Sequence, residues 1–260
     1  MRISLIFAIA ACTTGTLSSA QQRIDSEPRI VMLLADLQSA RASERARAFG
    51  DLRSDAASLN KSEVRAALVD LLDRENRYLD SLLEKAQRKG YPDEGDNAGW
   101  AEYYSDLLDT VDGFVDWNDP RQACILVNAN SSDDSAFAVE ISDHATTTIP
   151  CLVKRSESVV SMNRAVAVPV LVQALAKAKA ALESATIQAA KDTILRALHD
   201  PDDGVRASTV DALGSFGGTD MIPALKELSA HDRSPEIAGR SIRKSAAAAI
   251  AKIQKRAGQN

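Results

Sequence analysis

Apolar residues recur every three or four positions along most of the chain, which is the spacing of one face of an α-helix. Five such stripes stand out, at Val64–Leu72, Leu79–Ala86, Ile187–Leu198, Val205–Phe216 and Ile242–Ile253. No stretch alternates apolar and polar residues in the two-residue period of a half-buried strand. The hydrophobic pattern therefore predicts an all-α fold.

The β-branched run from Val166 to Val172 is the segment most similar to a strand. It continues directly into Gln173-Ala174-Leu175, which favours a helix. Proline is well tolerated in the first turn of a helix, where its missing N–H has no partner to lose. We therefore expect Pro169 to lie in the first turn of a helix.

Turn residues separate the C-terminal stripes. Asp200-Pro201-Asp202-Asp203-Gly204 provides a turn and a helix cap, and Gly217-Gly218 ends the next stripe. The connections are about three to five residues long, which forces neighbouring helices to pack antiparallel.

An internal repeat relates these helices. Val205–Leu213 aligns with Ile242–Ile250 at an offset of 37 residues. Glu44–Leu52 and Val64–Leu72 fit the same template more loosely. Self-similarity at this period is typical of helical solenoids, in which each hairpin buries its apolar face against the next one.

The stretch from Ile194 to Arg206, followed by Ala212-Leu213-Gly214, resembles a HEAT repeat of the short class also found in phycobilisome lyases. Met221–Leu225 resembles the opening helix of another unit. The resemblance is strong over residues 186–256, moderate over 30–88 and poor over 91–160. It implies an α-solenoid of antiparallel helical hairpins, a HEAT/armadillo-like superhelix, and protein–protein binding. It implies no particular chemistry.

These patterns divide the chain into four parts: a signal peptide at 1–20, N-terminal HEAT-like hairpins at 26–90, a divergent helical middle at 91–160 and C-terminal HEAT-like repeats at 161–256. In the middle part we expect a helix from Trp100 to Phe114, a short helix around Cys124 and a helix beginning near Pro150.

The first residues follow the order of a secretory signal. Met1-Arg2 gives a positive start, Ile3–Ala11 is apolar, and Ser18 and Ala20 suit a signal peptidase. We therefore expect a periplasmic or secreted protein. Ile9-Ala10-Ala11-Cys12 also fits a lipoprotein cleavage site, which would anchor the chain by a lipid on Cys12. No segment is apolar and long enough to predict an integral membrane span.

Composition and charge narrow the class of partner. The formal net charge is −5, which disfavours nucleic acid and anionic lipid because both require a basic surface. Cys124 and Cys151 are the two cysteines that follow the signal. An even number of cysteines in an exported chain predicts a disulfide, and two buried free thiols are the alternative.

Four arginines recur at one repeat position, Arg45, Arg65, Arg206 and Arg243. They have two interpretations: a row of cations that holds an acidic partner, or structural links to turn carboxylates such as Asp200 and Asp202. The second is favoured because the guanidinium fork suits carboxylates.

Aromatic residues gather in the middle part. Six of the eleven in the chain lie there: Tyr91, Trp100, Tyr103, Tyr104, Phe114 and Trp117. They are a possible protein-binding patch, since aromatic side chains anchor interfaces. Core filling is the favoured alternative, because large aromatic side chains are mostly buried.

No catalytic or metal-binding motif is present, and we expect neither enzymatic activity nor a cofactor. The function predicted from the sequence is an exported, non-enzymatic scaffold that binds another protein. Two alternatives remain: an enzyme or chromophore-lyase-like protein of the same repeat class, and a structural envelope lipoprotein anchored through Cys12.

Overall fold

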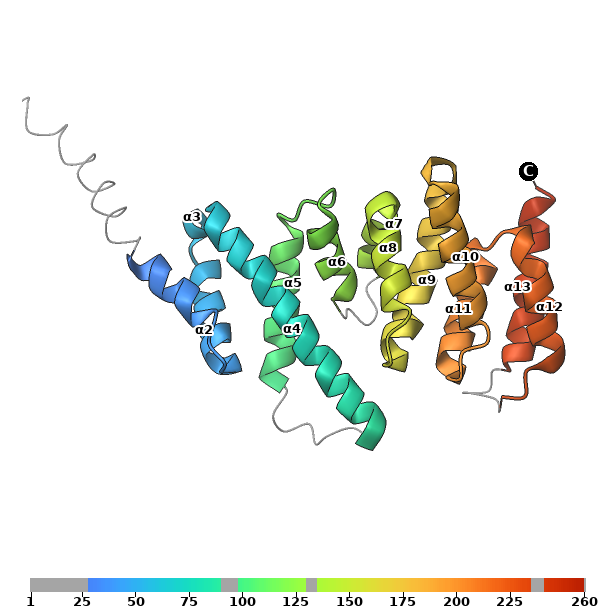
Figure 1. Ribbon diagram of the computed structural model, residues 1–260, viewed down its shortest axis with the longest axis horizontal. Coiled ribbons are helices and arrows are strands. Elements are labelled where there is room, and N and C mark those ends of the chain that lie inside the picture. Colours follow the sequence, from blue (N-terminus) through green and yellow to red (C-terminus); the bar gives the residue numbers. More distant parts are fainter. Residues whose placement is uncertain (1–27, 90–97, 130–134, 235–240, 260) are drawn as a thin grey trace, which may run out of the picture.

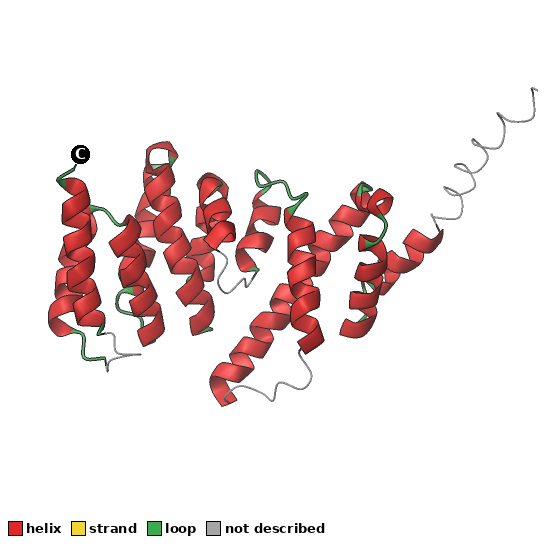
Figure 2. Ribbon diagram, turned by 180° about the vertical axis from the view of Figure 1, so that it is seen from behind, coloured by secondary structure: helices red, strands yellow, loops and turns green. Residues whose placement is uncertain are grey.

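The computed structural model describes residues 28–89, 98–129, 135–234 and 241–259, so the predicted signal peptide, Cys12 and Tyr91 lie outside the described residues. The described residues form helices and connecting turns and contain no strand. The helices stack side by side into an elongated array that follows the order of the chain (Figures 1 and 2). The all-α solenoid is thereby confirmed.

The N-terminal part consists of a helix at residues 28–36, α2 (Ala42–Arg53), the short α3 (Ala56–Leu59) and α4 (Ser62–Lys89). Helix α4 has 28 residues, which makes it about 42 Å long at 1.5 Å per residue. The stripes at Val64–Leu72 and Leu79–Ala86 therefore lie on one continuous helix.

The middle part contains α5 (Ala98–Asp112), α6 (Pro120–Asn128), α7 (Ser135–Asp143) and α8 (Ala145–Arg155). The Asp119 carboxylate accepts from the backbone N–H groups of Arg121 and Gln122 at the start of α6. Helix α8 begins five residues before Pro150, which corrects the expected boundary. The residues on either side of the proline, Ile149 and Cys151, are buried, and their packing offsets the missing backbone hydrogen bond.

The C-terminal part contains α9 (Ser161–Ala178), η2 (Lys179–Ala181), α10 (Ser184–Ala197), α11 (Asp203–Phe216), η3 (Thr219–Met221), α12 (Ile222–His231) and α13 (Ile242–Ala257). Helices α9, α11 and α13 pack against one another in succession. Pro169 lies in the middle of α9, so its expected place in a first turn was wrong. Buried residues on both sides of it, Val168, Val170 and Leu171, hold the helix together across the proline.

One apolar core runs from Ile30 to Ile253. Each hairpin contributes fully buried aliphatic residues, such as Leu52, Leu72, Leu126 and Leu198. Burial of each of these side chains stabilises the fold by about 2 kcal/mol. In the part of the chain that the structure describes, no helix combines the length and the hydropathy needed to cross a bilayer.

Helix α4 also contacts elements far along the chain. Asn76 donates to the carbonyl of Ile125 at 2.8 Å, and Asp80 accepts from Asn163 at 2.8 Å. Near its C-terminal end, Gln87 donates to the Val159 carbonyl and accepts from the Ser161 N–H. The helix therefore joins the N-terminal hairpins to α6 and to the turn between α8 and α9.

Candidate protein-binding site

The aromatic cluster of the middle part faces the core. Tyr103, Tyr104 and Trp117 are buried, and Trp100 and Phe114 are half-buried. Trp117 stacks on the His144 ring at 5.0 Å between centroids, and the Arg65 guanidinium lies 5.3 Å from the centre of the Phe114 ring. This arrangement agrees with core filling and leaves little of these five side chains for a partner.

Glu75 on α4 is the polar centre of this cluster. Its side chain is fully buried and accepts hydrogen bonds from Arg45 Nε at 2.6 Å, Trp100 Nε1 at 3.0 Å and Tyr103 OH at 3.3 Å. Burial lowers the pKa of the Arg45 guanidinium, but its contacts with Glu75 outweigh that effect and raise it. Sequence reasoning missed this group because Glu75 stands alone between two apolar stripes.

A repeated arginine contact fixes the start of several helices. Arg45, Arg65 and Arg206 each donate to the carbonyl six residues earlier, in the turn before the helix. Arg164 on α9 makes the same contact with the Ser158 carbonyl at 2.8 Å. Arg164 was missed because it precedes Arg206 by 42 residues, and the repeat was aligned at 37. Helices α9 and α10, with 18 and 14 residues, are longer than α11 and α12, with 14 and 10, and they contribute the extra length.

Arg164 and Arg206 also bind a carboxylate of the following hairpin, as Arg45 binds Glu75 on α4. Arg164 pairs with Asp200, and Arg206 pairs with Asp232 at 3.0 Å. Burial alone raises the pKa of the Asp200 carboxyl, but hydrogen bonds from Arg164 outweigh it, so the pKa lies below its ordinary value. For Asp232, contacts with Ser234 and Arg206 likewise outweigh burial and lower the pKa. These arginines therefore link successive hairpins.

The remaining repeat residues behave differently. Arg65 binds the Leu59 carbonyl and the Asn60 side chain, and Arg243 is exposed and donates to the Ser229 carbonyl. Asp202 caps α11 by accepting from the backbone N–H groups of Gly204 and Val205. Asp202 therefore stabilises the helix start, and its carboxylate forms no salt bridge with an arginine in the part of the chain that the structure describes.

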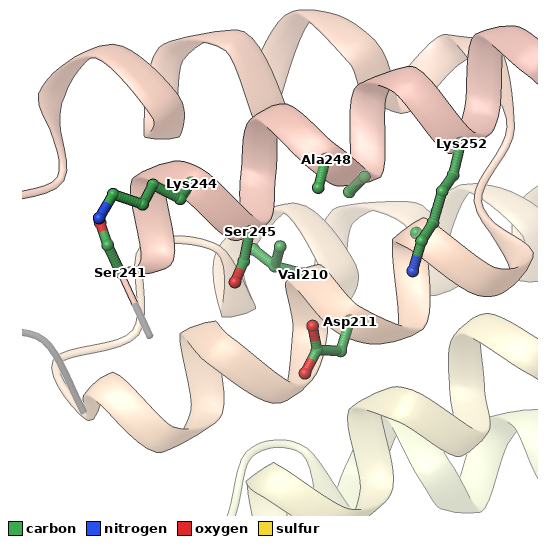
Figure 3. A pocket seen from close by; sticks show the side chains of 9 residues that line it. Val210, Asp211, Ser241, Lys244, Ser245, Ala248 and Lys252 are labelled. Atoms are coloured by element: carbon green, nitrogen blue, oxygen red, sulfur yellow. The ribbon is translucent and has the colours of Figure 1, made fainter. Parts of the chain in front are cut away.

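A groove with a volume of about 420 Å³ lies between α11 and α13. Lys244, Lys252 and Asp211 line it together with Ser241 and Ser245. Figure 3 shows Lys252 and Ser245 reaching from α13 toward α11, and Lys244 at the other end beside Ser241. The groove thus offers ammonium, hydroxyl and carboxylate groups over a floor of small residues.

Gly214 sets the depth of this groove. A Cβ atom at this position would lie 3.3 Å from the Cβ of Ala249 and 3.4 Å from its Cα, so glycine lets α11 and α13 approach closely. Arg256 then ties the two helices by donating to the carbonyls of Gly214 at 2.6 Å and Gly217 at 2.9 Å. The floor is consequently held in place by backbone contacts.

Asp112 at the end of α5 lies beside Glu140 of α7. Burial, followed by the neighbouring Glu140 carboxylate, raises the pKa of Asp112 to about 6. Its Oδ1 atom is buried and has no hydrogen-bond partner among the residues that the structure describes. In the described ranges no group of three or more His, Cys, Asp or Glu side chains is arranged to hold a metal ion.

Comparison with known proteins gives one family. The family model for HEAT repeats matches residues 169–251, which include most of the groove between α11 and α13. No curated protein matches the sequence of the chain. Residues 169–251 are thus similar to HEAT repeats, which is consistent with the all-α solenoid that the described residues form.

Proposed function

We propose that this protein is an exported scaffold that acts by binding another protein, and that the groove between α11 and α13 is part of the binding surface. Stacked helical hairpins provide an extended surface suited to a polypeptide, and HEAT repeats are typically used in this way. The observation that carries the proposal is the groove itself, in which charged and hydroxyl side chains surround a floor of small residues.

Export is supported by the predicted signal at residues 1–20 and by the cysteine pair. Cys124 on α6 and Cys151 on α8 are joined as a disulfide, with their Cα atoms 5.2 Å apart. Disulfides persist mainly outside the cytoplasm. Mass spectrometry of the mature N-terminus tests this part of the proposal: cleavage after Ala20 is expected, whereas a lipid on Cys12 would identify an anchored lipoprotein.

The binding surface is tested by filling the groove. Ala248 is exposed and lines it, so Ala248→Trp adds bulk there without disturbing the core. Ala247→Trp is the matched control, because Ala247 is exposed on the same helix but does not line the groove. In crosslinking pulldowns from the envelope fraction, the first variant should lose partners that the wild type and the control retain. Equal capture by both variants would contradict the proposal.

A further inference from the structure

Arg155 on α8 is a cation inside the apolar core. It is only 6% exposed, and its Nη1 donates to the carbonyls of Val127 and Ala129, which are neutral acceptors. Among the described residues its guanidinium is connected to a carboxylate only through Asn163, which accepts from Nη2 at 3.5 Å and donates to Asp80 at 2.8 Å. Burial lowers the pKa of the guanidinium, and the attraction of Asp80 offsets only part of this effect. The positive charge therefore lacks a direct partner of opposite sign in the part of the chain that the structure describes.

One edge of the Arg155 guanidinium has donors without a strong acceptor. The Nε atom is buried and has no hydrogen-bond partner among the described residues, and the Nη2 contact with Asn163 is long. A buried donor that stays unpaired destabilises the fold, so native proteins contain few of them. Arg164 uses the same Nε–Nη2 edge to bind both oxygens of Asp200. The chemistry that suits this edge is therefore a carboxylate.

A cavity of about 40 Å³ adjoins Arg155 between α6, α7, α8 and α9. Its other lining residues are all apolar, among them Phe137, Ile141, Leu152 and Val170. One water needs about 10–15 Å³ of such space, so the cavity accommodates a group of a few non-hydrogen atoms. Water suits it poorly, because a buried water requires about two to four polar partners and Arg155 is the only polar side chain of the lining.

From this geometry we infer that the cavity binds a short aliphatic monocarboxylate, such as propionate, whose carboxylate accepts from Nε and Nη2 of Arg155. The methyl and methylene groups then lie against the apolar walls, away from water. A bare anion such as chloride would gain the contact with Arg155, but it would exchange its hydration for apolar walls. The site lies in the middle part of the chain and does not rest on the proposed binding of a protein at the groove between α11 and α13.

Propionate itself is the probe. The urea midpoint of the protein is measured in sodium propionate, in sodium chloride at the same concentration, and in sodium chloride with propionamide, which is neutral and has nearly the same shape. A ligand that binds only the folded state raises its stability. Propionate should therefore raise the midpoint above its value in chloride, and propionamide should not.

Two alanine positions separate binding in the cavity from a general effect of the salt. Ala138→Leu fills the cavity and leaves Arg155 in place, because Ala138 is half-buried and lines it. Ala165→Leu is the matched control: Ala165 is also half-buried and packs against the core, but it does not line the cavity. The shift in propionate should be lost in the first variant and kept in the second. Arg155→Met, which removes the charge, should lose it too, and Ala138→Leu decides the question if that variant does not fold.

Two results would overturn the inference. Equal shifts in the wild type and Ala138→Leu would show that propionate acts on the whole surface and not in the cavity. Equal responses to propionate and propionamide would show that the charge of Arg155 plays no part. The pulldown with Ala248→Trp concerns a different surface, so failure of either proposal leaves the other unaffected.

Discussion

The Arg164 guanidinium binds both carboxylate oxygens of Asp200, with Nε–Oδ2 and Nη2–Oδ1 distances of 2.7 Å each. This fork joins α9 to the turn between α10 and α11, and the two side chains are only 14% and 10% exposed. Removing one partner of a well-buried pair leaves the other uncompensated. Arg164→Ala should therefore lower the free energy of unfolding by about 3 kcal/mol, as measured by urea denaturation.

The double variant Arg164→Ala/Asp200→Ala distinguishes pairing from simple loss of packing. Its stability should be higher than the sum of the two single changes predicts, because neither charge is then left alone. Arg243→Ala is the control: within the described residues this exposed arginine donates to a carbonyl and pairs with no carboxylate, and its loss should cost less than about 0.5 kcal/mol. If the stability losses of the two single variants simply add up in the double variant, Arg164 and Asp200 do not stabilise the fold as a pair.

Glu75 should be one of the least replaceable residues of the N-terminal part. Glu75→Ala leaves the Arg45 guanidinium buried without its carboxylate and also removes the acceptor of Trp100. The expected loss is about 3–5 kcal/mol. Arg45→Met together with Glu75→Leu should restore much of it, because an apolar pair of similar volume removes both charges. No recovery in the double variant would show that the hydrogen-bonding network matters more than the charge.

The disulfide between α6 and α8 closes a loop over a sequence separation of 27 residues. On the chain-entropy model, such a loop stabilises the folded state by about 3.5 kcal/mol. Reduction should therefore lower the urea midpoint of the wild type, and it should leave a Cys124→Ser/Cys151→Ser variant unchanged. A wild-type midpoint that does not respond to reductant would contradict the predicted contribution of the bond.

Asp112 should make stability fall with rising pH. Its pKa is about 6 in the folded protein against 3.8 in the unfolded chain, so the folded state holds the proton more tightly. Ionising Asp112 therefore costs more free energy in the folded protein than in the unfolded chain. This loss of stability is absent below pH 4, grows between about pH 4 and 6 and is complete above that range. Because the side chain is only partly buried, solvent screening reduces the penalty to about 1 kcal/mol.

Asp112→Asn should therefore be about 1 kcal/mol more stable than the wild type at pH 7 and equal to it near pH 4. Urea denaturation of both proteins across this pH range measures the difference in their free energies of unfolding. Contributions that the two proteins share, such as those of Asp200 and Asp232, cancel in this difference. These carboxyls have lowered pKa values and act in the opposite direction, losing stability as pH falls. Asp109→Asn, at an exposed position, is the control. A constant difference between wild type and Asp112→Asn would contradict the prediction.

The helical periodicity was sufficient to predict the class of fold, because amphipathic stripes and turn residues such as Asp200-Pro201 act locally. Helix limits near prolines were not predictable in the same way. Pro150 and Pro169 read locally as helix starts, but tertiary packing of their buried neighbours carries both helices through them. The length of α4 was missed for a related reason, since two stripes on one helix look like two helices.

The other features that the sequence did not predict depend on contacts between residues that lie far apart in the chain. The repeat alignment found Arg206 but not Arg164. The pair of Arg164 with Asp200 depends on how close the two side chains lie in the folded structure, and not on a constant number of residues between repeats. The groove was not visible in the sequence either. Its floor depends on Gly214 and Ala249 facing each other across α11 and α13, and nothing in their local sequence indicates that they meet. The aromatic residues of the middle part stand out as a group in the sequence, but the sequence does not show the contacts that Trp100 and Tyr103 make with Glu75.

Helix α4 should change the order in which parts of the molecule unfold. An ordinary solenoid is a one-dimensional chain of neighbours, so it can fray from either end one hairpin at a time. Here Gln87 contacts the turn at Val159 and Ser161, which lies four helices further along the chain, after α5, α6, α7 and α8. Partial opening of the N-terminal end consequently strains that turn as well, and hydrogen exchange should register residues 62–89 and the start of α9 as a single cooperative unit.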